Sequence, residues 1–372
     1  MEYRAMGASL LGYGGMRFPV NRETRAIDEE KAAPLLHRAM EAGITYYDTA
    51  WPYHDGESEV FFGRVLSQYP RDSYQLATKL PCWEVKSREQ AEDIIRTQLE
   101  RLQTGYVDFY LLHSLTRKTW NKMLELDILP LLEEYQSQGK LRRLGFSFHD
   151  DYSVFEEILR YRNWDFCQIQ LNYMDTHHQA GLRGLELARS KGIPVVVMEP
   201  VKGGSLAMLP EEATGLFREL DPEASTASWA MRWVGSQPGV AVILSGMTTR
   251  EQLEDNLRTF SDFRPLDEQE AEAVEVTARR LRQRLKNGCT GCRYCIPCPA
   301  GVDIPKSFQI WNNMAMYGNV RLTKRAWRGL APEERPDQCV GCGRCEELCP
   351  QHIPIREHLA QITGEVNSFI GL

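Results

Sequence analysis

Two runs of four cysteines, each closing on a Cys-Pro pair, are the residues of this chain whose spacing most clearly indicates chemistry. The first run is Cys289, Cys292, Cys295 and Cys298, and the second is Cys339, Cys342, Cys345 and Cys349. Three thiolates separated by two residues can wrap one iron–sulfur cluster, whereas the fourth, beside proline, is carried to a second cluster. The spacing therefore predicts two [4Fe–4S] clusters that exchange their fourth ligands.

This crossed arrangement assigns Cys289, Cys292, Cys295 and Cys349 to one cluster, and Cys339, Cys342, Cys345 and Cys298 to the other. The second run has the full bacterial ferredoxin spacing, and the first is one residue shorter before its last cysteine. Zinc and disulfides are the alternatives, but zinc is usually held by two separated Cys-x-x-Cys pairs, and disulfides suit an oxidising compartment. The spacing favours iron–sulfur. Cys82 and Cys167 stand alone, and we expect both to be small buried hydrophobes.

A second set of polar residues follows apolar runs in the first third of the chain. Asp48, Lys79 and His113 each close such a run, and Tyr53 lies in the loop after Asp48. A hydride that reaches a carbonyl carbon leaves charge on the oxygen, which needs a proton donor and a positive environment. Lys79 would make the Tyr53 phenol more acidic, Asp48 would hold Lys79, and His113 would bind the oxygen. Taken singly, Lys79 could be a surface charge and His113 a hydrogen-bonded core histidine. Together, the four residues predict a carbonyl-reducing site.

Eight short β-rich runs alternate with amphipathic helical segments before residue 280, and they must position these four residues. The runs are "SLLGYGG", "ITYYDTA", "YQLATKL", "VDFYLLH", "RLGFSFH", "FCQIQLN", "IPVVVMEP" and "VAVILSGM". This α/β alternation predicts a (β/α)8 TIM barrel over residues 1–280, with an open doubly wound sheet as the lesser alternative. In a barrel, polar residues at the carboxyl ends of strands tend to be catalytic.

Residues 281–372 form the second predicted domain, a small ferredoxin-like iron–sulfur domain with a helical insert between the cysteine runs. Five large side chains of the insert are spaced as one packed helical face: Trp311, Met314, Met316, Tyr317 and Trp327. The preceding stretch "DEQEAEAVEVTARRLRQRLKNG" predicts a charged connecting helix that ends at Gly288. We expect the domain boundary near residue 280.

Charge and hydropathy exclude two classes of partner. Residues 281–372 hold 12 Lys and Arg against 8 Asp and Glu, whereas residues 1–280 hold 32 against 43. The positive excess of the tail is too small and scattered to predict nucleic-acid binding, although it would offset the charge of bound thiolates. No apolar run reaches the roughly 18 residues of a membrane span, and the start lacks a signal peptide, so we expect a cytoplasmic protein.

The motifs "DTAWPYHDGESEVFFGRVL", "LATKL" and "VDFYLLH" closely resemble those of the aldo-keto reductase family. The resemblance covers roughly residues 8 to 260 and places the family's tetrad on Asp48, Tyr53, Lys79 and His113. It implies a barrel that binds NAD(P)H without a Rossmann fold and transfers hydride to a small-molecule aldehyde or ketone. Trp51 and His54 flank Tyr53, so we expect them to line the pocket and to favour an apolar or planar carbonyl substrate.

The resemblance also implies cofactor contacts at Gly15, Met16, Ser147, Gln168, Met198, Pro200, Gly203, Gly246, Gln252 and Asn256. Ser147 and Gln168 match the family's contacts to the nicotinamide carboxamide. Three positions depart from the family pattern: Phe148 replaces an asparagine, Met198 replaces the aromatic residue that stacks on the nicotinamide, and Gln252 stands where arginine is frequent. The choice between NAD and NADP therefore stays open.

The barrel combined with a two-cluster tail is similar to ferredoxin-fused members of the same family. Nicotinamide moves two electrons as hydride and a cluster moves one, and a flavin is the usual adaptor. The chain has no clear flavin signature, although the glycines of "VKGGSL" would leave room for a phosphate. Three hypotheses follow: a carbonyl reductase with structural or sensing clusters, an enzyme that couples a one-electron carrier protein to the barrel, and a non-catalytic scaffold.

Overall fold

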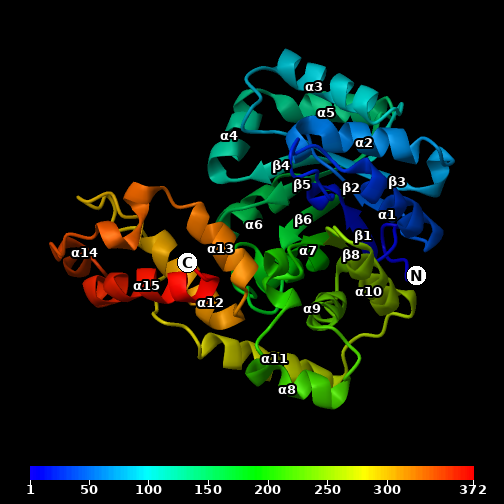
Figure 1. Cartoon of the computed structure of the whole chain (residues 1–372). Helices are drawn as coiled ribbons and strands as arrows, with labels where there is room; N and C mark the ends of the chain where they lie inside the picture. The colour runs from blue at the N-terminus through cyan, green and yellow to red at the C-terminus, as the bar shows by residue number, and fades with distance from the viewer. The chain divides into compact units, whose positions relative to one another are not determined.

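The computed structural model describes all 372 residues, and the chain begins with a closed barrel of eight parallel strands (Figure 1). The strands are β1 (Leu11–Gly14), β2 (Tyr46–Asp48), β3 (Gln75–Leu80), β4 (Val107–Leu115), β5 (Leu141–Phe148), β6 (Phe166–Gln170), β7 (Val195–Met198) and β8 (Val240–Ser245). Each strand pairs with the next, and β1 closes the barrel against β8. The predicted barrel is confirmed, with one strand in each of the eight runs.

Helices follow the strands around the barrel and cover its outer surface. They are α1 (Glu29–Glu41), α2 (Glu57–Leu66), α3 (Arg88–Arg101), α4 (Arg117–Glu125), α5 (Ile128–Ser137), α6 (Tyr152–Tyr161), α7 (Gly181–Ser190), α9 (Thr226–Gly235) and α10 (Arg250–Ser261). Short 3-10 turns form η1 (Gly15–Arg17), η2 (Tyr53–Gly56), η3 (Arg71–Ser73) and η4 (Lys202–Ala207). Because the strands are buried on both faces, their sequences are nearly continuous apolar runs.

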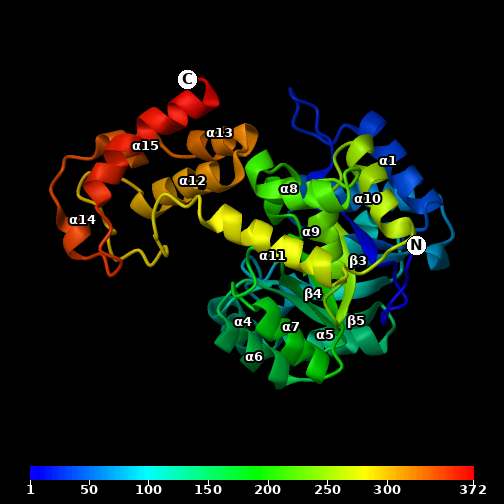
Figure 2. The ribbon, with the colours of Figure 1, turned by 90° about the horizontal axis from the view of Figure 1, so that it is seen from below.

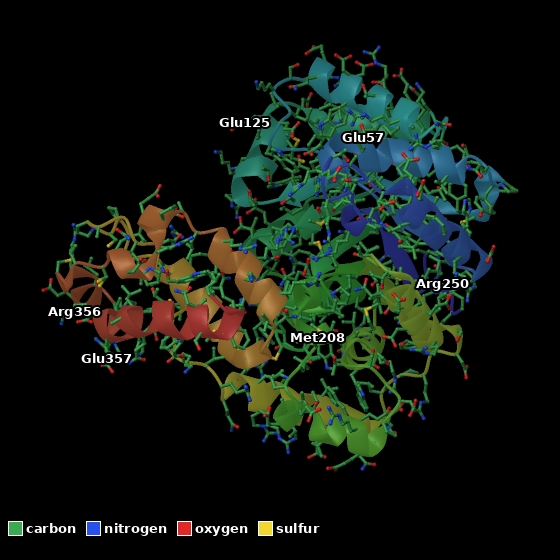
Figure 3. The ribbon with its side chains drawn as sticks, in the orientation of Figure 1. Glu57, Glu125, Met208, Arg250, Arg356 and Glu357 are labelled. Atoms are coloured by element: carbon green, nitrogen blue, oxygen red, sulfur yellow. The ribbon has the colours of Figure 1, made fainter.

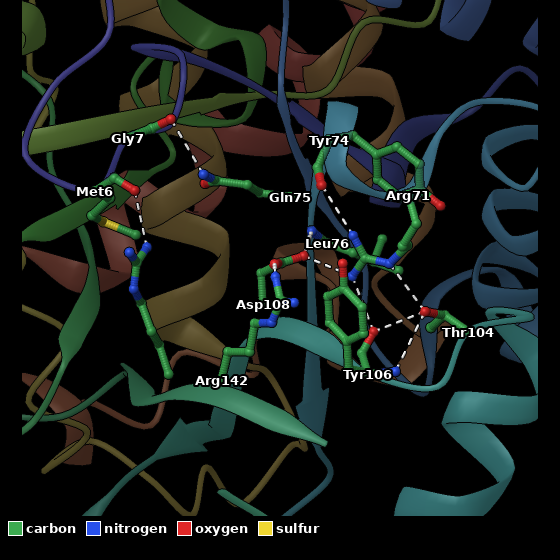
Figure 4. A network of polar contacts seen from close by, with 11 residues as sticks. Met6, Gly7, Arg71, Tyr74, Gln75, Leu76, Thr104, Tyr106, Asp108 and Arg142 are labelled. Carbon is green, nitrogen blue, oxygen red and sulfur yellow. Dashed lines mark hydrogen bonds and ion pairs between the residues drawn. The ribbon is translucent and has the colours of Figure 1, made fainter. Parts of the chain in front are cut away.

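The amino end of the barrel is closed by packed side chains and an ionic network. Tyr46, Phe109, Phe166 and Val242 pack inside it with Met6 of the N-terminal segment. Nearby, the network drawn in Figure 4 joins the starts of three strands through Asp108, Arg71 and Arg142. In barrels of this kind, this end contributes to stability and the opposite end carries the chemistry.

The internal packing divides the chain into two units. The first consists of residues 1–202 and 228–267, and the second of residues 203–227 and 268–372. The second unit contains α8 (Glu211–Leu220), α11 (Glu268–Arg282), α12 (Ile304–Tyr317), α13 (Val320–Arg328), η5 (Pro332–Glu334), η6 (Pro336–Gln338), α14 (Arg344–Glu347) and α15 (Ile355–Ile370). Helix α8 lies alongside α11 (Figure 2). The single domain boundary near residue 280 stays a prediction.

The tail has its own hydrophobic core beneath the cysteine loops. Phe308 and Trp311 of α12, Trp327 of α13 and Ile362 of α15 are buried in it, and six of the eight clustered cysteines pack against its edge. All five large side chains predicted to form the packed face of the insert are buried. Arg356, labelled in Figure 3, donates to Glu346 over 3.0 Å and ties α15 to α14.

Two further observations concern helix ends and helix hydropathy. The connecting helix α11 ends at Arg282 rather than at Gly288, so that expectation was wrong. Residues 283 and 284 form a turn instead, and the chain runs irregularly from there into the first cysteine loop. No helix of the structure combines the length and the apolar composition needed to cross a bilayer.

Candidate functional site

Asp48 and Lys79 meet at the carboxyl ends of neighbouring strands. The register pairs Asp48 with Ala77, so Lys79 lies two residues further along the same face of β3. Lys79 Nζ donates to Asp48 Oδ1 over 2.6 Å and to the backbone oxygen of Thr49 over 2.6 Å. The Lys79 side chain has no exposed surface, and that of Asp48 is 4% exposed. A buried charge is costly unless it is paired and hydrogen-bonded, and these contacts meet both conditions.

The pair places a positive charge beside Tyr53. Burial lowers the pKa of Lys79, but attraction to Asp48 and Tyr53 outweighs burial and leaves this pKa above its ordinary value. Burial raises the pKa of the Asp48 carboxyl, and the Lys79 ammonium opposes that effect. The ammonium lies 5.0 Å from the centroid of the Tyr53 ring. Burial also raises the pKa of the Tyr53 phenol, against the effect of Lys79, so the phenol keeps its proton at neutral pH.

The loop that carries Tyr53 is built from left-handed backbone. His54, Asp55 and Gly56 have φ of 51°, 56° and 93°, respectively. Such conformations cost of order 1–3 kcal/mol for a non-glycine residue and concentrate at functional sites. His54 Nε2 accepts from the backbone N–H of Phe18 over 3.2 Å. One ring nitrogen of His54 therefore anchors the loop, and its place in the lining of the pocket stays a prediction.

His113 completes the group, lying edge-on to Tyr53 with the ring centroids 5.9 Å apart. Its Nδ1 is buried and has no hydrogen-bond partner. Burial, together with repulsion from Lys79 and His149, lowers the pKa of His113 well below its ordinary value of 6.5. The imidazole is therefore neutral at pH 7, and its single N–H can donate to a substrate oxygen. The structure thus brings together all four residues that the sequence proposed for catalysis.

Two tryptophans and a glutamate form the rim above these residues. Trp51 Nε1 donates to Glu84 Oε2 over 3.1 Å, and Trp83 Nε1 donates to Glu84 Oε1 over 3.2 Å. The ring of Trp83 lies 5.0 Å from that of His113. Trp51 was expected near the pocket, whereas Trp83 and Glu84 were missed. Their position directly after the Lys79 strand, in "LATKLPCWE", was the available signal.

The eight clustered cysteines line two neighbouring cavities in the second unit. One is lined by Cys289, Cys292, Cys295 and Cys349. The other is lined by Cys298, Cys339, Cys342 and Cys345, and Cys295 also reaches it. No three Cys, His, Asp or Glu side chains converge closely enough to hold a single metal ion, so the thiols surround spaces rather than points. Four thiols around each space fit a [4Fe–4S] cluster, and the grouping is the one that crossed ligation requires.

The two cysteine loops share a backbone feature. Gly291 and Gly341 each follow the first cysteine of their run by two residues, and both have φ of 71°. Only glycine adopts this conformation freely, and it lets the chain turn around the cavity. The next cysteine in each loop, Cys292 or Cys342, is exposed, whereas the other six are partly buried. Each cavity is therefore lined by one exposed cysteine.

A model described as the aldo/keto reductase family matches residues 10–278. The chain belongs to this family. A second model, a 4Fe-4S dicluster domain, matches residues 288–353 and supports iron–sulfur clusters in the tail. Among solved structures, aldo-keto reductase AKR11C1 from Bacillus halodurans in its holo form is 26% identical with a TM-score of 0.62, and the match covers 74% of this chain and 96% of that one.

Curated relatives match the barrel at similar levels. L-galactose dehydrogenase of Arabidopsis thaliana is 25% identical over 318 residues, which cover 77% of this chain and 96% of the relative. NADH-specific methylglyoxal reductase of Escherichia coli is 25% identical over 278 residues, or 63% of this chain and 84% of the relative. The uncharacterised oxidoreductase YqkF of Bacillus subtilis is 27% identical over 282 residues, or 67% and 88%.

In this aldo/keto reductase, the two candidate carboxamide contacts lie on paired strands. Ser147 of β5 is in register with Gln168 of β6, and both side chains are buried. Gln168 Nε2 contacts Met198 Sδ at 3.4 Å, and its Oε1 is buried without a hydrogen-bond partner. An unpaired buried oxygen is costly, and it fits an amide N–H donor such as that of a nicotinamide. Phe148, at the position of the family's asparagine, packs instead against Phe155 in the core.

The candidate cofactor contacts after β8 form hydrogen bonds within their own loop and helix. Asn256 Nδ2 donates to Ser245 Oγ over 2.8 Å, and Gln252 Oε1 accepts from the backbone N–H of Thr248 over 2.8 Å. A Cβ on Gly246 would approach the Arg17 side chain to 3.0 Å, so the glycine admits that side chain. These contacts bring the end of β8 and the start of α10 together.

The remaining candidates behave differently from one another. A Cβ on Gly15 would lie 2.3 Å from the Phe62 ring, so this glycine is required for packing against α2. Met16 is exposed and Pro200 is buried. Gly203 has φ of 64° and is the first residue of the segment 203–227, which belongs to the second unit.

The loops after β6 and β7 contain a charged contact that the sequence did not reveal. Lys202 Nζ donates to both oxygens of Asp175, at 2.7 and 2.5 Å, and Asn172 Nδ2 donates to Asp175 Oδ2 at 3.0 Å. The ammonium of "VKGG" is thus already neutralised, which weakens the expectation of a phosphate beside it. Polar residues directly after the strands, in "LNYMD" and "EPVK", were the available signal.

Proposed function

We propose that this chain reduces an aldehyde or ketone by hydride transfer from NAD(P)H, with Tyr53 as the proton donor. The observation that carries the proposal is the Lys79 ammonium, which is bonded to Asp48 and held 5.0 Å from the Tyr53 ring while His113 faces the same phenol. This arrangement supplies both the proton and the positive environment that a developing alkoxide needs. The family's oxidoreductase character supports the same chemistry.

Each residue of the group has one task in this proposal. The neutral His113 donates its N–H to the carbonyl oxygen and fixes the position of that oxygen. Tyr53 passes its phenolic proton to the same oxygen as the alcohol forms. The resulting phenolate is stabilised by Lys79, whose charge depends on Asp48. Asp48 and Lys79 do not touch the substrate, so both act by setting the acidity of Tyr53.

The chain's own residues also suit the bound cofactor. NAD(P)H supplies a hydride when it is bound. Ser147 and Gln168 would hold its carboxamide, because Gln168 Oε1 is buried and unpartnered. Met198 lies against Gln168 and would offer a thioether where the family has an aromatic face. We therefore expect weaker stacking at this position.

The test is the turnover of anaerobically purified full-length Tyr53→Phe with NADPH, then NADH, and a panel of aldehydes. We expect carbonyl reduction to fall by about 10²–10⁴-fold, the usual contribution of a positioned general acid. Tyr161→Phe, which alters an exposed tyrosine of α6, is the matched control and should turn over normally. Normal turnover by Tyr53→Phe would refute the proposal.

In the second unit, we propose that the two cavities hold two [4Fe–4S] clusters with crossed ligation. Cys289, Cys292, Cys295 and Cys349 would hold one, and Cys339, Cys342, Cys345 and Cys298 the other, since these sets line the two cavities. Each cluster stores one electron when present. Thiolate ligation suits a reducing cytoplasm, where we place this protein.

A second candidate function has an observation of its own. Cys295 and Ile304 line both cavities, so the two sites are neighbours within the unit. Two adjacent clusters suit a path for single electrons between an external carrier and the barrel. Anaerobic titration with NADPH and then NADH, followed by the visible absorbance of the clusters, separates the candidates. Bleaching favours the electron-transfer enzyme, and unchanged clusters with competent carbonyl turnover favour clusters that are structural or sensing.

A further inference from the structure

The helix α13 (Val320–Arg328) carries four cations on a single face. Arg321, Lys324, Arg325 and Arg328 are spaced three, one and three residues apart, which places them within an arc of about 100°. Thr323 and Trp327 point the other way and are buried. We call the four cations the basic stripe. The sequence alone shows them as part of a scattered excess, and the helix gathers them.

No carboxylate neutralises the basic stripe. None of its four side chains forms an ion pair or hydrogen bond in the structure, and α13 contains no acidic residue. Several exposed arginines on other helices are paired, for example Arg160 with Glu156 and Arg189 with Glu186. The four cations of the stripe thus differ from these arginines, because none of the four has an acidic partner.

The four cations of the stripe repel one another, and this repulsion destabilises the helix. Arg321 and Arg325 are four residues apart, as are Lys324 and Arg328, and like charges at this spacing destabilise a helix. The helix dipole favours Arg325 and Arg328 in the last turn but disfavours Arg321 in the first. Stability of α13 comes from its other face, where Trp327 is buried in the core of the unit. An anionic partner would relieve the repulsion.

The inner face of α13 belongs to the same core as the cluster-binding cysteines. Trp327 lies in the hydrophobic cluster against which Cys298, Cys339 and Cys345 pack. The guanidinium of Arg335 lies 5.9 Å from the Trp327 ring, and Cys339 follows four residues later. A partner seated on the stripe would therefore contact the unit that holds both cysteine cavities.

We propose that the basic stripe is the docking surface for an acidic one-electron carrier protein that exchanges electrons with the clusters. This inference rests on the second candidate function. Residues 1–280 carry a net negative charge, and the positive excess of residues 281–372 offsets the charge of bound thiolates, so the stripe is the local positive face that attracts an acidic carrier. Transient redox complexes have small interfaces, so a docking surface need not extend over the whole unit. Exposed Val320 begins the helix and offers an apolar contact beside the charges.

The test compares two full-length, cluster-loaded variants that lose the same charge. The stripe variant combines Arg321→Gln, Lys324→Gln, Arg325→Gln and Arg328→Gln, because glutamine keeps the helix propensity. The control combines Arg22→Gln, Lys86→Gln, Lys118→Gln and Lys191→Gln, four exposed cations of the barrel unit that likewise lack ion pairs. The probe is a purified acidic two-cluster ferredoxin. Calorimetry measures its binding, and stopped-flow spectroscopy measures cluster reduction by its dithionite-reduced form, both at low and high salt.

We expect the stripe variant to lose at least about tenfold in affinity and in second-order rate at low salt, and to lose most of the salt dependence. The control should behave as wild type. Equal losses in both variants, or none in either, would overturn the proposal. So would a stripe variant that changes only self-association or heparin binding, since these outcomes identify a second copy or a nonspecific polyanion as the occupant.

Reduction by methyl viologen radical, a small mediator that needs no docking surface, shows whether the clusters of each variant are intact. It also separates the two proposals. If wild type binds ferredoxin through the stripe but its clusters accept no electrons from it, the electron-transfer function is refuted, whereas the stripe is still a binding surface for the acidic protein. If the clusters accept electrons from ferredoxin equally well in wild type and the stripe variant, the surface fails and the function stands.

Discussion

Trp83 lies against His113, with ring centroids 5.0 Å apart, where β3 and β4 reach the carboxyl end of the barrel. The indole N–H of Trp83 is held by Glu84, which also accepts from Trp51 of the Tyr53 loop. A single carboxylate therefore links the loops that follow β2 and β3. If a carbonyl substrate binds at His113 as proposed, we expect the orientation of Trp83 to affect which substrates fit.

Glu84 is expected to act as a positioning residue for substrate selection. Glu84→Ala releases both indoles, and two hydrogen bonds of about 1 kcal/mol each are lost. We expect KM for planar aromatic aldehydes to rise about tenfold while kcat changes little, and the kinetics with a small aliphatic aldehyde to stay as in wild type. Glu84→Gln keeps one acceptor and should give a smaller shift. Steady-state kinetics with both aldehydes check this, and an equal loss for the small aliphatic aldehyde would point to a general structural role instead.

Removing the carboxylate of Asp48 should change the pH dependence of turnover. Asp48 raises the pKa of Lys79 against the effect of burial, so in Asp48→Asn burial prevails and that pKa falls. Lys79 then loses its proton at a lower pH, so the alkaline decrease in kcat should begin at a lower pH than in wild type. The folded state should also lose about 3–5 kcal/mol, because a buried ammonium is left without its partner. An alkaline limb that stays in place in the variant would show that Lys79 does not control it.

His113 should make the barrel sensitive to acid. Burial lowers the pKa of His113 in the folded state, whereas the unfolded chain binds the proton at about pH 6.5. Below that pH the unfolded state holds more protons, so stability falls as pH falls, by at most about 1.4 kcal/mol per pH unit. Urea unfolding of His113→Asn at pH 7 and pH 5.5 should show a smaller difference than wild type. The control is His177→Asn, an exposed histidine; if it reduces the difference as much, His113 is not the cause.

The sequence revealed the barrel and the four catalytic candidates because both depend on local order. Each strand is a short β-rich run, and Asp48, Lys79 and His113 close three of those runs, so strand order alone brings them together. The contact between Trp51 and Glu84 depends instead on the conformation of two separate loops, which no periodicity encodes. The same holds for Lys202 and Asp175, from the loops after β7 and β6.

Helix details in the tail were hidden for a different reason. The alternation of charged and apolar residues continues past Arg282, but the backbone N–H groups of Lys286 and Asn287 donate to Asn312 Oδ1 of α12, a tertiary contact that periodicity does not encode. The four cations of α13 read as scattered charge until the helix places them on one face. Counting charges cannot detect such a surface, because the relevant quantity is their angular position around a helix axis.

Asp108 should matter for stability and not for turnover. It accepts from Arg71 over 2.7 Å and from Arg142 over 3.1 Å, and these guanidinium groups lie 3.9 and 3.6 Å from the centroid of the Tyr106 ring (Figure 4). Asp108→Asn leaves two guanidinium groups facing each other across this ring. We expect a loss of about 2–4 kcal/mol in urea unfolding. Because the network lies at the amino ends of the strands, kcat/KM of the folded variant should match wild type, and a large drop would contradict its structural role.

Crossed ligation can be tested by combining cysteine substitutions. Cys298 lines the cavity of Cys342, not that of Cys292, although it belongs to the same run as Cys292. If ligation is crossed, Cys298→Ala with Cys342→Ala removes two ligands from one cluster, and about half of the iron should remain. Cys298→Ala with Cys292→Ala removes one ligand from each cluster, so both should be destabilised and more iron lost. Iron and sulfide content after anaerobic purification checks this.

The reciprocal pairs serve as the control for these iron measurements. Cys349→Ala with Cys292→Ala should retain about half of the iron, and Cys349→Ala with Cys342→Ala should lose more, because Cys349 lines the cavity of Cys292. Ligation within each run predicts the reverse order in all four variants. Equal losses in all four would mean that neither set of ligands acts as a unit, and electron paramagnetic resonance of the reduced proteins would then show whether any intact cluster remains.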